Sequence, residues 1–532
     1  MTESTTPPLI RRTAHILRPD PTRVVSKLFL PGQEFLAAER SRSAAVLDRV
    51  LALHEAEVSR ALAATMASFG SRHRDLAATL ESRFRLVAHR LADPDALSPE
   101  RRQLVGAYFS QEYAVEAAAL FNPSMVAHPD QDGLPPGTMR FVMSVRGVGE
   151  GHISSIEFRT GTIDENDAIT FDALSSTTVL AQAVPTTYSR AVFAQQHAEL
   201  GGDQSSARFV LEALPASFVR ADLDRTLARL RAQRLTRASA AKTIDQFERI
   251  AACNYSITFP ADSAMNERVI LPTGPSESHG LEDVRLVKFT GSDGGVGYLG
   301  TYTAFDGGRV VPQLLRTDDF RTFQITQLSG SAAKNKGMAL FPRPVDGQHL
   351  ALSRWDREDN SLATSDDWSN WVDVGTLERP HEPWEIVQLG NCGSPLETPA
   401  GWLVLTHGVG PMREYSIGAM LLDLDDPRKV RGRLHQPLLT PAADERNGYV
   451  PNVVYSCGGL VHNDTLVLPY GESDVAIRIA LINLTELLQE LQGTGTRREA
   501  LTSLPGHDDV PLARRRRPRR VPGRPVGPRG TR

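Results

Sequence analysis

Apolar residues recur along this chain with two different periods. Over residues 33–115 they return every three to four positions, as at Leu47, Val50 and Leu51, and glycine is nearly absent. This spacing puts apolar side chains on one face of a helix. We therefore predict an α-helical domain over 33–115. Residues 1–32 contain five prolines and are predicted to be irregular.

From Phe121 onward the pattern changes to short apolar runs that end at turns, which is typical of β-strands. Residues 205–252 interrupt these runs with helical spacing, as at Leu223 and Leu227. We therefore predict a mainly β domain over 116–490 that carries a helical insert.

Comparable strands recur in this domain about every 50 to 60 residues, which is the spacing expected for the blades of a β-propeller. Each follows a turn and ends in a polar or aromatic residue; they cover 297–302, 348–354, 401–407 and 464–470. A strand at 139–146 adds a fifth. The sequence thus predicts a five-bladed β-propeller with an α-helical N-terminal domain, and a β-sandwich is the alternative. In a propeller, strand ends from all blades meet at one mouth and can share a site.

The composition is that of a globular protein. The 532 residues are 23% charged and 41% hydrophobic, and no apolar run reaches the roughly 18 residues that a membrane span requires. The N-terminus lacks the apolar core of a signal peptide. Three scattered cysteines are too few for a disulfide framework or a zinc site. We therefore expect a cytoplasmic protein with no bound metal and no membrane contact.

Charge is distributed unevenly along the chain. Residues 513–532 contain nine arginines and no acidic residue, so their charge of +9 leaves −13 for residues 1–512 out of a net charge of −4. We predict that 491–532, rich in arginine and proline, form a disordered tail. Because the folded part is acidic, we expect no specific nucleic-acid partner.

Carboxylates, cations and aromatic residues lie at or near the predicted strand ends. Glu282 and Asp283 stand just before a strand, and alternation along a strand would point them to opposite faces. Carboxylates accept hydrogen bonds from sugar hydroxyls, and one carboxyl group must protonate the leaving oxygen. Cations would bind an anionic co-substrate such as phosphate. The other candidates are Asn122, Arg146, Tyr302, Asp306, Lys336, Arg354, His407, Tyr415, Tyr470 and Asp474.

Several short motifs occur in a fixed order between about 122 and 488. They include Phe121–Pro123, Gly280–Arg285, Ala339–Pro342, Gly401–Leu403, Val450–Val454 and Tyr470–Gly471. Their order and spacing resemble glycoside hydrolase family 130. The resemblance implies a five-bladed propeller that cleaves β-mannosidic bonds with inversion, by phosphorolysis or by hydrolysis. The N-terminal helices and the insert lie outside the common core and resemble an extended branch of that family.

The resemblance also implies roles for single residues. Asp283 would be the general acid, passing its proton through a hydroxyl of the bound mannosyl residue. Sugar binding would fall to Asn122, Arg146 and Asp474, with Glu282, Tyr302, Asp306 and Tyr470 as further candidates. The anion would bind where Lys336, Arg354, His407 and Tyr415 gather. Attack by water needs a second carboxylate as base, and Glu397 and Glu445 are the candidates.

Some of these residues have structural alternatives. Tyr302 and Tyr470 could instead pack between blades, and Arg354 could form an ion pair with Asp356. Cys392, in a tight glycine-rich turn, is a weaker candidate for a nucleophile.

Two positions depart from the family pattern. Val284 stands where the family usually has proline, and Gln388 stands where many of its phosphorylases have a lysine for phosphate. The missing cation favours hydrolysis, but the remaining cationic set leads us to favour phosphorolysis, which gives mannose 1-phosphate.

The sequence therefore predicts a glycoside phosphorylase or glycosidase that acts on an oligosaccharide, with inorganic phosphate as co-substrate and no other cofactor. A non-catalytic sugar-binding or scaffold propeller and a glycosidase of different sugar specificity remain as alternatives. The N-terminal helices are candidates for a homo-oligomer contact or for closing the cleft.

Overall fold

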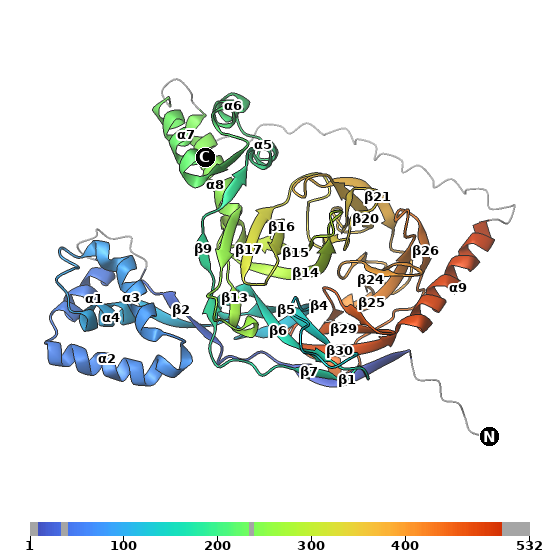
Figure 1. Cartoon of the computed structure of the whole chain (residues 1–532), viewed down its shortest axis with the longest axis horizontal. Helices are drawn as coiled ribbons and strands as arrows, with labels where there is room; N and C mark the ends of the chain where they lie inside the picture. Colours follow the sequence, from blue (N-terminus) through green and yellow to red (C-terminus); the bar gives the residue numbers. More distant parts are fainter. Residues whose placement is uncertain (1–8, 33–40, 234–238, 503–532) are drawn as a thin grey trace, which may run out of the picture.

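The computed structural model describes residues 9–32, 41–233 and 239–502. Its sheets lie around a common centre, and helices pack outside them (Figure 1). The chain is therefore mainly β, as the strand pattern predicted.

Twelve strands form the largest sheet. They are β4 (Ala119–Ala127), β5 (Met139–Val148), β6 (Ser154–Ile163), β7 (Ile169–Phe171), β8 (Val179–Leu180), β9 (Gln182–Val184), β12 (Tyr255–Thr258), β13 (Arg268–Ile270), β14 (Gly280–Thr290), β15 (Val296–Phe305), β16 (Val310–Thr317) and β17 (Thr322–Gln327). Their order is β4-β5-β6-β14-β15-β16-β17-β12-β9, with β7 and β13 on β6 and β8 on β13. A single parallel pair, Ser154 with Gly280, joins β6 to β14. Two antiparallel groups of strands therefore meet at that point.

Three smaller sheets complete the ring. The four-stranded sheet contains β18 (Ala339–Leu340), β19 (His349–Ser353), β20 (Asn360–Ser365) and β21 (Val372–Glu378). The next contains β22 (Gln388–Asn391), β23 (Leu396–Thr398), β24 (Gly401–Val409), β25 (Tyr415–Leu422) and β26 (Val430–Arg433). The last contains β27 (Val454–Tyr455), β28 (Leu460–His462), β29 (Thr465–Glu472), β30 (Ala476–Asn483) and, from the start of the chain, β1 (Ile10–Leu17).

The predicted N-terminal helices are present and have a core of their own. They are α1 (Arg42–Leu51), α2 (Glu55–Phe69), α3 (Leu76–Val87) and α4 (Pro99–Tyr108). Ser98 caps α4 by accepting a hydrogen bond from the backbone N–H of Arg101, and Pro99 opens the helix. Gly106 lets α4 approach α3 closely, since a Cβ there would lie 1.9 Å from the carbonyl oxygen of Leu80.

The helical insert is longer than predicted and is followed by a helix that the tail prediction missed. The insert contains α5 (Arg190–Glu199), α6 (Gln204–Ala213), α7 (Arg220–Ala232) and α8 (Ala240–Cys253), together with the two-stranded sheet of β10 (Thr187–Ser189) and β11 (Ser217–Val219). It starts at about 187, rather than at 205, because the polar sequence of α5 shows little helical periodicity. Helix α9 (Leu484–Thr502) runs into the segment predicted to be disordered; the rest of that tail lies outside the described residues.

The prediction that residues 1–32 are irregular is wrong. β1 pairs with β30, and β2 (Val24–Leu28) pairs with β3 (Ser110–Ala114). The prolines lie before, between and after β1 and β2 in the sequence. The residues within these strands therefore keep the N–H groups that pairing requires. The first and the last of the described strands are thus neighbours in one sheet.

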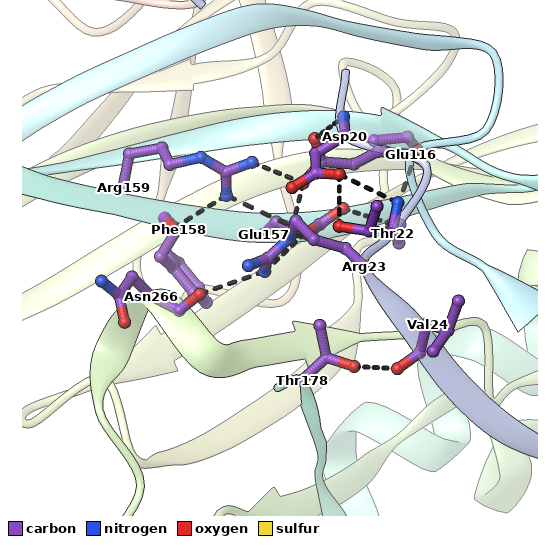
Figure 2. Close-up of polar contacts among 12 residues, drawn as sticks. Asp20, Thr22, Arg23, Val24, Glu116, Glu157, Phe158, Arg159, Thr178 and Asn266 are labelled. Atoms are coloured by element: carbon purple, nitrogen blue, oxygen red, sulfur yellow. Dashed lines mark hydrogen bonds and ion pairs between the residues drawn. The ribbon is translucent and has the colours of Figure 1, made fainter. Parts of the chain in front are cut away.

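Two arginines and two glutamates form a buried network where the N-terminal segment meets β6 (Figure 2). The Nε of Arg23 lies 2.7 Å from Oε1 of Glu116, and its Nη2 lies 3.0 Å from Oε2 of Glu157. Arg159 also donates to Glu116, and all four residues are at most 3% exposed. Burial, and then the charge of Glu116, raise the pKa of Glu157 to about 8. Loss of one member would leave a buried charge without a partner, so this network anchors the N-terminal segment to the sheet.

Candidate active-site cavity

A cavity of about 340 Å³ opens where strand ends and loops from four sheets meet. Its walls are Ala118, Ala119, Phe121, Asn122, Arg146, Val148, His152, Asp283, Lys336, Arg354, Gln388, His407, Arg413, Tyr415, Tyr449, Val450, Val453, Tyr455 and Asp474. Eight of the predicted site residues are therefore brought together although they span more than 350 positions of the sequence: Asn122, Arg146, Asp283, Lys336, Arg354, His407, Tyr415 and Asp474.

Two β-bulges turn side chains into this cavity. The pairing of β14 with β15 shifts between Glu282 and Arg285, and Asp283 has a φ of +61°. The pairing of β4 with β5 shifts after Phe121, and Asn122 has a φ of +50°. The Nδ2 of Asn122 donates to Oδ1 of Asp283 at 2.8 Å. Left-handed backbone at non-glycine residues is strained and collects at functional sites, where bulges re-aim side chains.

Arg146 holds the two adjacent carboxylates. Its Nη1 lies 3.1 Å from Oδ1 of Asp283, and its Nη2 lies 2.7 Å from Oε1 of Glu282. The Nζ of Lys336 contacts the other oxygen of Glu282 at 2.5 Å. The prediction that the two carboxylates precede the strand is wrong, because both lie within β14, at its bulge. Glu282 does not line the cavity, so it positions Arg146 and Lys336 rather than the sugar.

The two carboxylates of the cavity have pKa values shifted in opposite directions. Burial alone would raise the pKa of Asp283, but Arg146, Arg285 and Lys336 and the hydrogen bond from Asn122 lower it to about 2. Burial, and then the negative charge of Asp283, raise the pKa of Asp474 to about 6. In the free protein at neutral pH, Asp283 is therefore ionised and accepts hydrogen bonds. Such divergent pairs are typical of acid–base sites.

Arg354 is the centre of a cationic wall, and it contacts His407. The Nη1 of Arg354 lies 3.2 Å from Nε2 of His407, and the side-chain nitrogen of Gln388 lies at the same distance from that atom. Because a guanidinium can only donate, Nε2 must accept, and the imidazole is neutral. Burial, followed by the charges of Arg354 and Arg285, lowers the pKa of His407 well below its ordinary value and agrees with this assignment.

The guanidinium of Arg354 is short of partners. Its Nε is buried without a hydrogen bond, and it forms no ion pair with any carboxylate in the described part of the chain. The alternative of an ion pair with Asp356 is not realised, since Asp356 accepts instead from the backbone N–H groups of Glu358 and Asp359. A largely buried cation of this kind is best satisfied by an anionic ligand.

Besides Glu282, five predicted site residues do not line the cavity. Glu397 pairs with Arg343 at the surface, and Asp306 accepts hydrogen bonds within its own turn. Glu445 is fully buried and accepts from the hydroxyl of Tyr470. We therefore withdraw Glu397 and Glu445 as bases and Asp306 as a sugar ligand.

The two tyrosines belong to the core. The hydroxyl of Tyr302 donates to Glu277, and that of Tyr470 donates to Glu445; both rings pack in hydrophobic clusters. The packing alternative is correct for both, because alternation along β15 and β29 directs these side chains into the interior.

Four cavity residues were missed by sequence reasoning: His152, Arg413, Tyr449 and Tyr455. His152 ends the short 3₁₀ helix η4 (Glu150–His152), and Arg413 ends η7 (Pro411–Arg413). Tyr455 accepts a 2.7 Å hydrogen bond from the buried guanidinium of Arg285. Two of the four could have been predicted from their position in the sequence, since Tyr449 and Tyr455 flank the Val450–Val454 motif.

Within the described residues, no group of three or more histidine, cysteine or acidic side chains could hold a metal ion. None of the described helices is both long and apolar enough to cross a membrane. All three cysteines are buried and free, and burial raises the pKa of the Cys392 thiol to about 12. Cys392 is thus not activated as a nucleophile.

Known proteins resemble parts of this chain. The model of a family described as beta-1,4-mannooligosaccharide phosphorylase matches residues 246–492. A 1,2-beta-oligomannan phosphorylase of Thermoanaerobacter sp. is 35% identical over 222 residues, which are 40% of this chain and 71% of that protein. A beta-1,2-mannobiose phosphorylase of Listeria innocua is 32% identical over 231 residues, which are 42% of this chain and 63% of that protein. The solved structure of a beta-1,2-mannobiose phosphorylase of L. innocua with beta-1,2-mannobiose aligns with 72% of this chain and 93% of its own, at 21% identity and a TM-score of 0.41.

Proposed function

The chain belongs to glycoside hydrolase family 130, and on that basis we propose that it cleaves β-mannosidic bonds by phosphorolysis with inversion, releasing mannose 1-phosphate. Its relatives named above are phosphorylases of β-mannosides, which supports an enzyme of the same class. The observation that carries the choice of phosphate is the unpaired guanidinium of Arg354 in the cavity wall.

Phosphate would provide the hydrogen-bond acceptors and the negative charge that the cationic wall lacks. A dianion in contact with Arg354, and within reach of Lys336 and Tyr415, would supply the acceptor oxygens that the guanidinium lacks. His407 is neutral and positions Arg354 through its Nε2. Gln388 offers an amide where many family phosphorylases have a lysine, so this wall binds phosphate with one fewer charge. We propose that the exposed Arg413, which lies over the ring of Tyr415 at 5.7 Å, contributes part of that missing charge.

Asp283 is proposed as the general acid, acting through a hydroxyl of the bound mannosyl residue, while Asn122, Arg146 and Asp474 hold that sugar. The charges that keep Asp283 ionised in the free protein are Arg146, Arg285 and Lys336. A bound phosphate dianion would offset part of this positive charge, and a bound sugar would exclude water. Both changes raise the pKa of Asp283 and prepare it to carry a proton.

The bonds and protons balance without another reactant. The bond between C1 and the leaving oxygen breaks as a phosphate oxygen bonds to C1 from the opposite face. The hydroxyl of the bound mannosyl residue gives its proton to the leaving oxygen and takes the proton of Asp283, and the proton that hydrogen phosphate carries restores Asp283. Because phosphate brings its own negative charge, this route needs no carboxylate base.

Hydrolysis is the second candidate, and Asp474 is the observation that favours it. It is the other carboxylate of the cavity, and a pKa of about 6 suits a general base near neutral pH. In that case Asp474, rather than Glu397 or Glu445, would activate the water.

We also propose that the sheets constitute five blades of a β-propeller. Three blades would be the four-stranded sheet and the two five-stranded sheets. The 12-stranded sheet would supply two more, β4–β7 and β12 with β14–β17, since only one residue pair joins β6 to β14. A cytoplasmic location and a homo-oligomer contact through α1–α4 stay predictions.

The test is to incubate the protein with a panel of β-linked manno-oligosaccharides, with and without inorganic phosphate. Proton and phosphorus NMR would identify the products. Mannose 1-phosphate formed only with phosphate supports phosphorolysis. Free mannose formed at an equal rate without phosphate would support hydrolysis and assign Asp474 as the base. Binding without any product would favour a sugar-binding propeller.

A further inference from the structure

One side of the cavity differs from both the acidic centre, formed by Asp283 and Asp474, and the cationic wall around Arg354. Ala119, Val148 and Val450 line it, together with the rings of His152 and Tyr449. The two rings stack on each other with centroids 5.8 Å apart and an interplanar angle of 26°. Neither the proposed position of the mannosyl residue nor that of phosphate gives this apolar, aromatic side a role.

Tyr449 is unusually open for a large aromatic residue. It is 68% exposed although it lines the cavity and packs against His152. His152 has a φ of +58°, a left-handed backbone that fixes the direction in which its imidazole leaves the chain. The histidine therefore backs the tyrosine ring and leaves most of that ring available to a ligand.

The pairing of β4 with β5 places this side next to the acidic centre. Phe121 lies opposite Arg146, which contacts Asp283, and Ala119 lies opposite Val148. The second pair is two residues further along both strands and on the same face, or roughly 7 Å away. That is about one pyranose residue beyond the sugar that Arg146 and Asp283 would hold.

The direction of the reaction identifies the occupant. Inversion requires that the nucleophile and the leaving group lie on opposite faces of the reacting sugar. The cationic wall comes from β22, β24 and β25 and from Arg354, whereas the aromatic side comes from β4, β5, η4 and the loop before β27, which adjoins the wall where Val453 pairs with Tyr415. We propose that Tyr449, backed by His152, is the platform on which the leaving sugar stacks, and that this pair sets which sugars the enzyme accepts as leaving group or acceptor.

This inference rests on the proposed function, and the synthetic direction tests it most directly. With mannose 1-phosphate as donor and a free sugar as acceptor, Tyr449→Ala is expected to raise the KM for the acceptor about tenfold, as loss of one stacked ring would. The KM for mannose 1-phosphate should stay within about twofold. His152→Ala should shift the acceptor KM in the same direction, whereas Tyr449→Phe, which keeps the ring, should restore most of the affinity.

Met412→Ala is the matched control, because Met412 is 91% exposed beside Arg413 and does not line the cavity. An acceptor KM unchanged in Tyr449→Ala, or an equal rise in both KM values, would overturn the platform while leaving the proposed function intact. Absence of product from the unmodified enzyme in both directions would overturn the two together.

Discussion

Replacing Arg354 with glutamine should have opposite effects on activity and on stability. The guanidinium would make charge-assisted hydrogen bonds to phosphate, and each such contact contributes about 1.5–3 kcal/mol. The KM for phosphate should therefore rise roughly 10- to 150-fold. In the free protein, however, the guanidinium is largely buried without a carboxylate, and burial lowers its pKa. Removing that unpaired charge should stabilise the fold by about 1–2 kcal/mol.

Two measurements separate this prediction from a structural role for Arg354. Initial rates against phosphate concentration give the KM, and thermal unfolding with and without phosphate gives the stability. Phosphate should raise the melting temperature of the unmodified enzyme but not that of Arg354→Gln. Arg343→Gln is the control, since Arg343 is an exposed arginine paired with Glu397 and should change neither quantity appreciably. A lower melting temperature in Arg354→Gln with an unchanged KM for phosphate would refute the reasoning.

Three further predictions concern Asp283, Asp474 and Arg23. Asp283→Asn should abolish turnover and leave sugar binding within about tenfold, since only the proton in the transition state is lost; retained activity would remove Asp283 from the mechanism. Asp474→Asn should stabilise the fold more at pH 7.5 than at pH 5, as followed by thermal unfolding. The folded-state pKa of Asp474 is raised to about 6, so its ionised form costs stability above that pH, and protonation relieves the cost below it; an equal effect at both pH values would contradict this. Arg23→Met should destabilise the protein by about 3–5 kcal/mol in denaturant unfolding, because Glu116 and Glu157 would share one remaining arginine. Adding Glu116→Leu should recover part of the loss, and no recovery would argue against a charge effect.

The strand period predicted more of the fold than the composition did. Repeated strands about 50 to 60 residues apart indicated a ring of sheets and hence a shared mouth, and Asn122, Arg354 and Asp474 do meet there although they are distant in sequence. The strand β1 was missed because its partner, β30, lies at the other end of the chain, and local prolines were the stronger signal.

The orientation of side chains was harder to predict. The bulge at Asp283 adds a residue to β14, so alternation along the strand could not predict how Glu282 and Asp283 are placed around Arg146. Tyr302 and Tyr470 were predicted to bind sugar because tyrosine is common in sugar sites. Both side chains instead lie on the inward face of a strand and pack in the hydrophobic core. A short helix or loop such as that bearing His152 has no period to read, so its approach to Tyr449 could not be predicted.

The pairing of β1 with β30 has a consequence for how this protein is made. Residues 10–17 are synthesised roughly 460 residues before their hydrogen-bonding partners at 477–482. At ordinary rates of translation the first strand waits roughly 25 to 90 seconds for its neighbour. During that time its edge is unpaired and open to a wrong partner. Completion of the ring therefore waits until β30 has been made, and a chain truncated before β30 would keep an open last sheet and a free β1, which makes such fragments natural clients for chaperones.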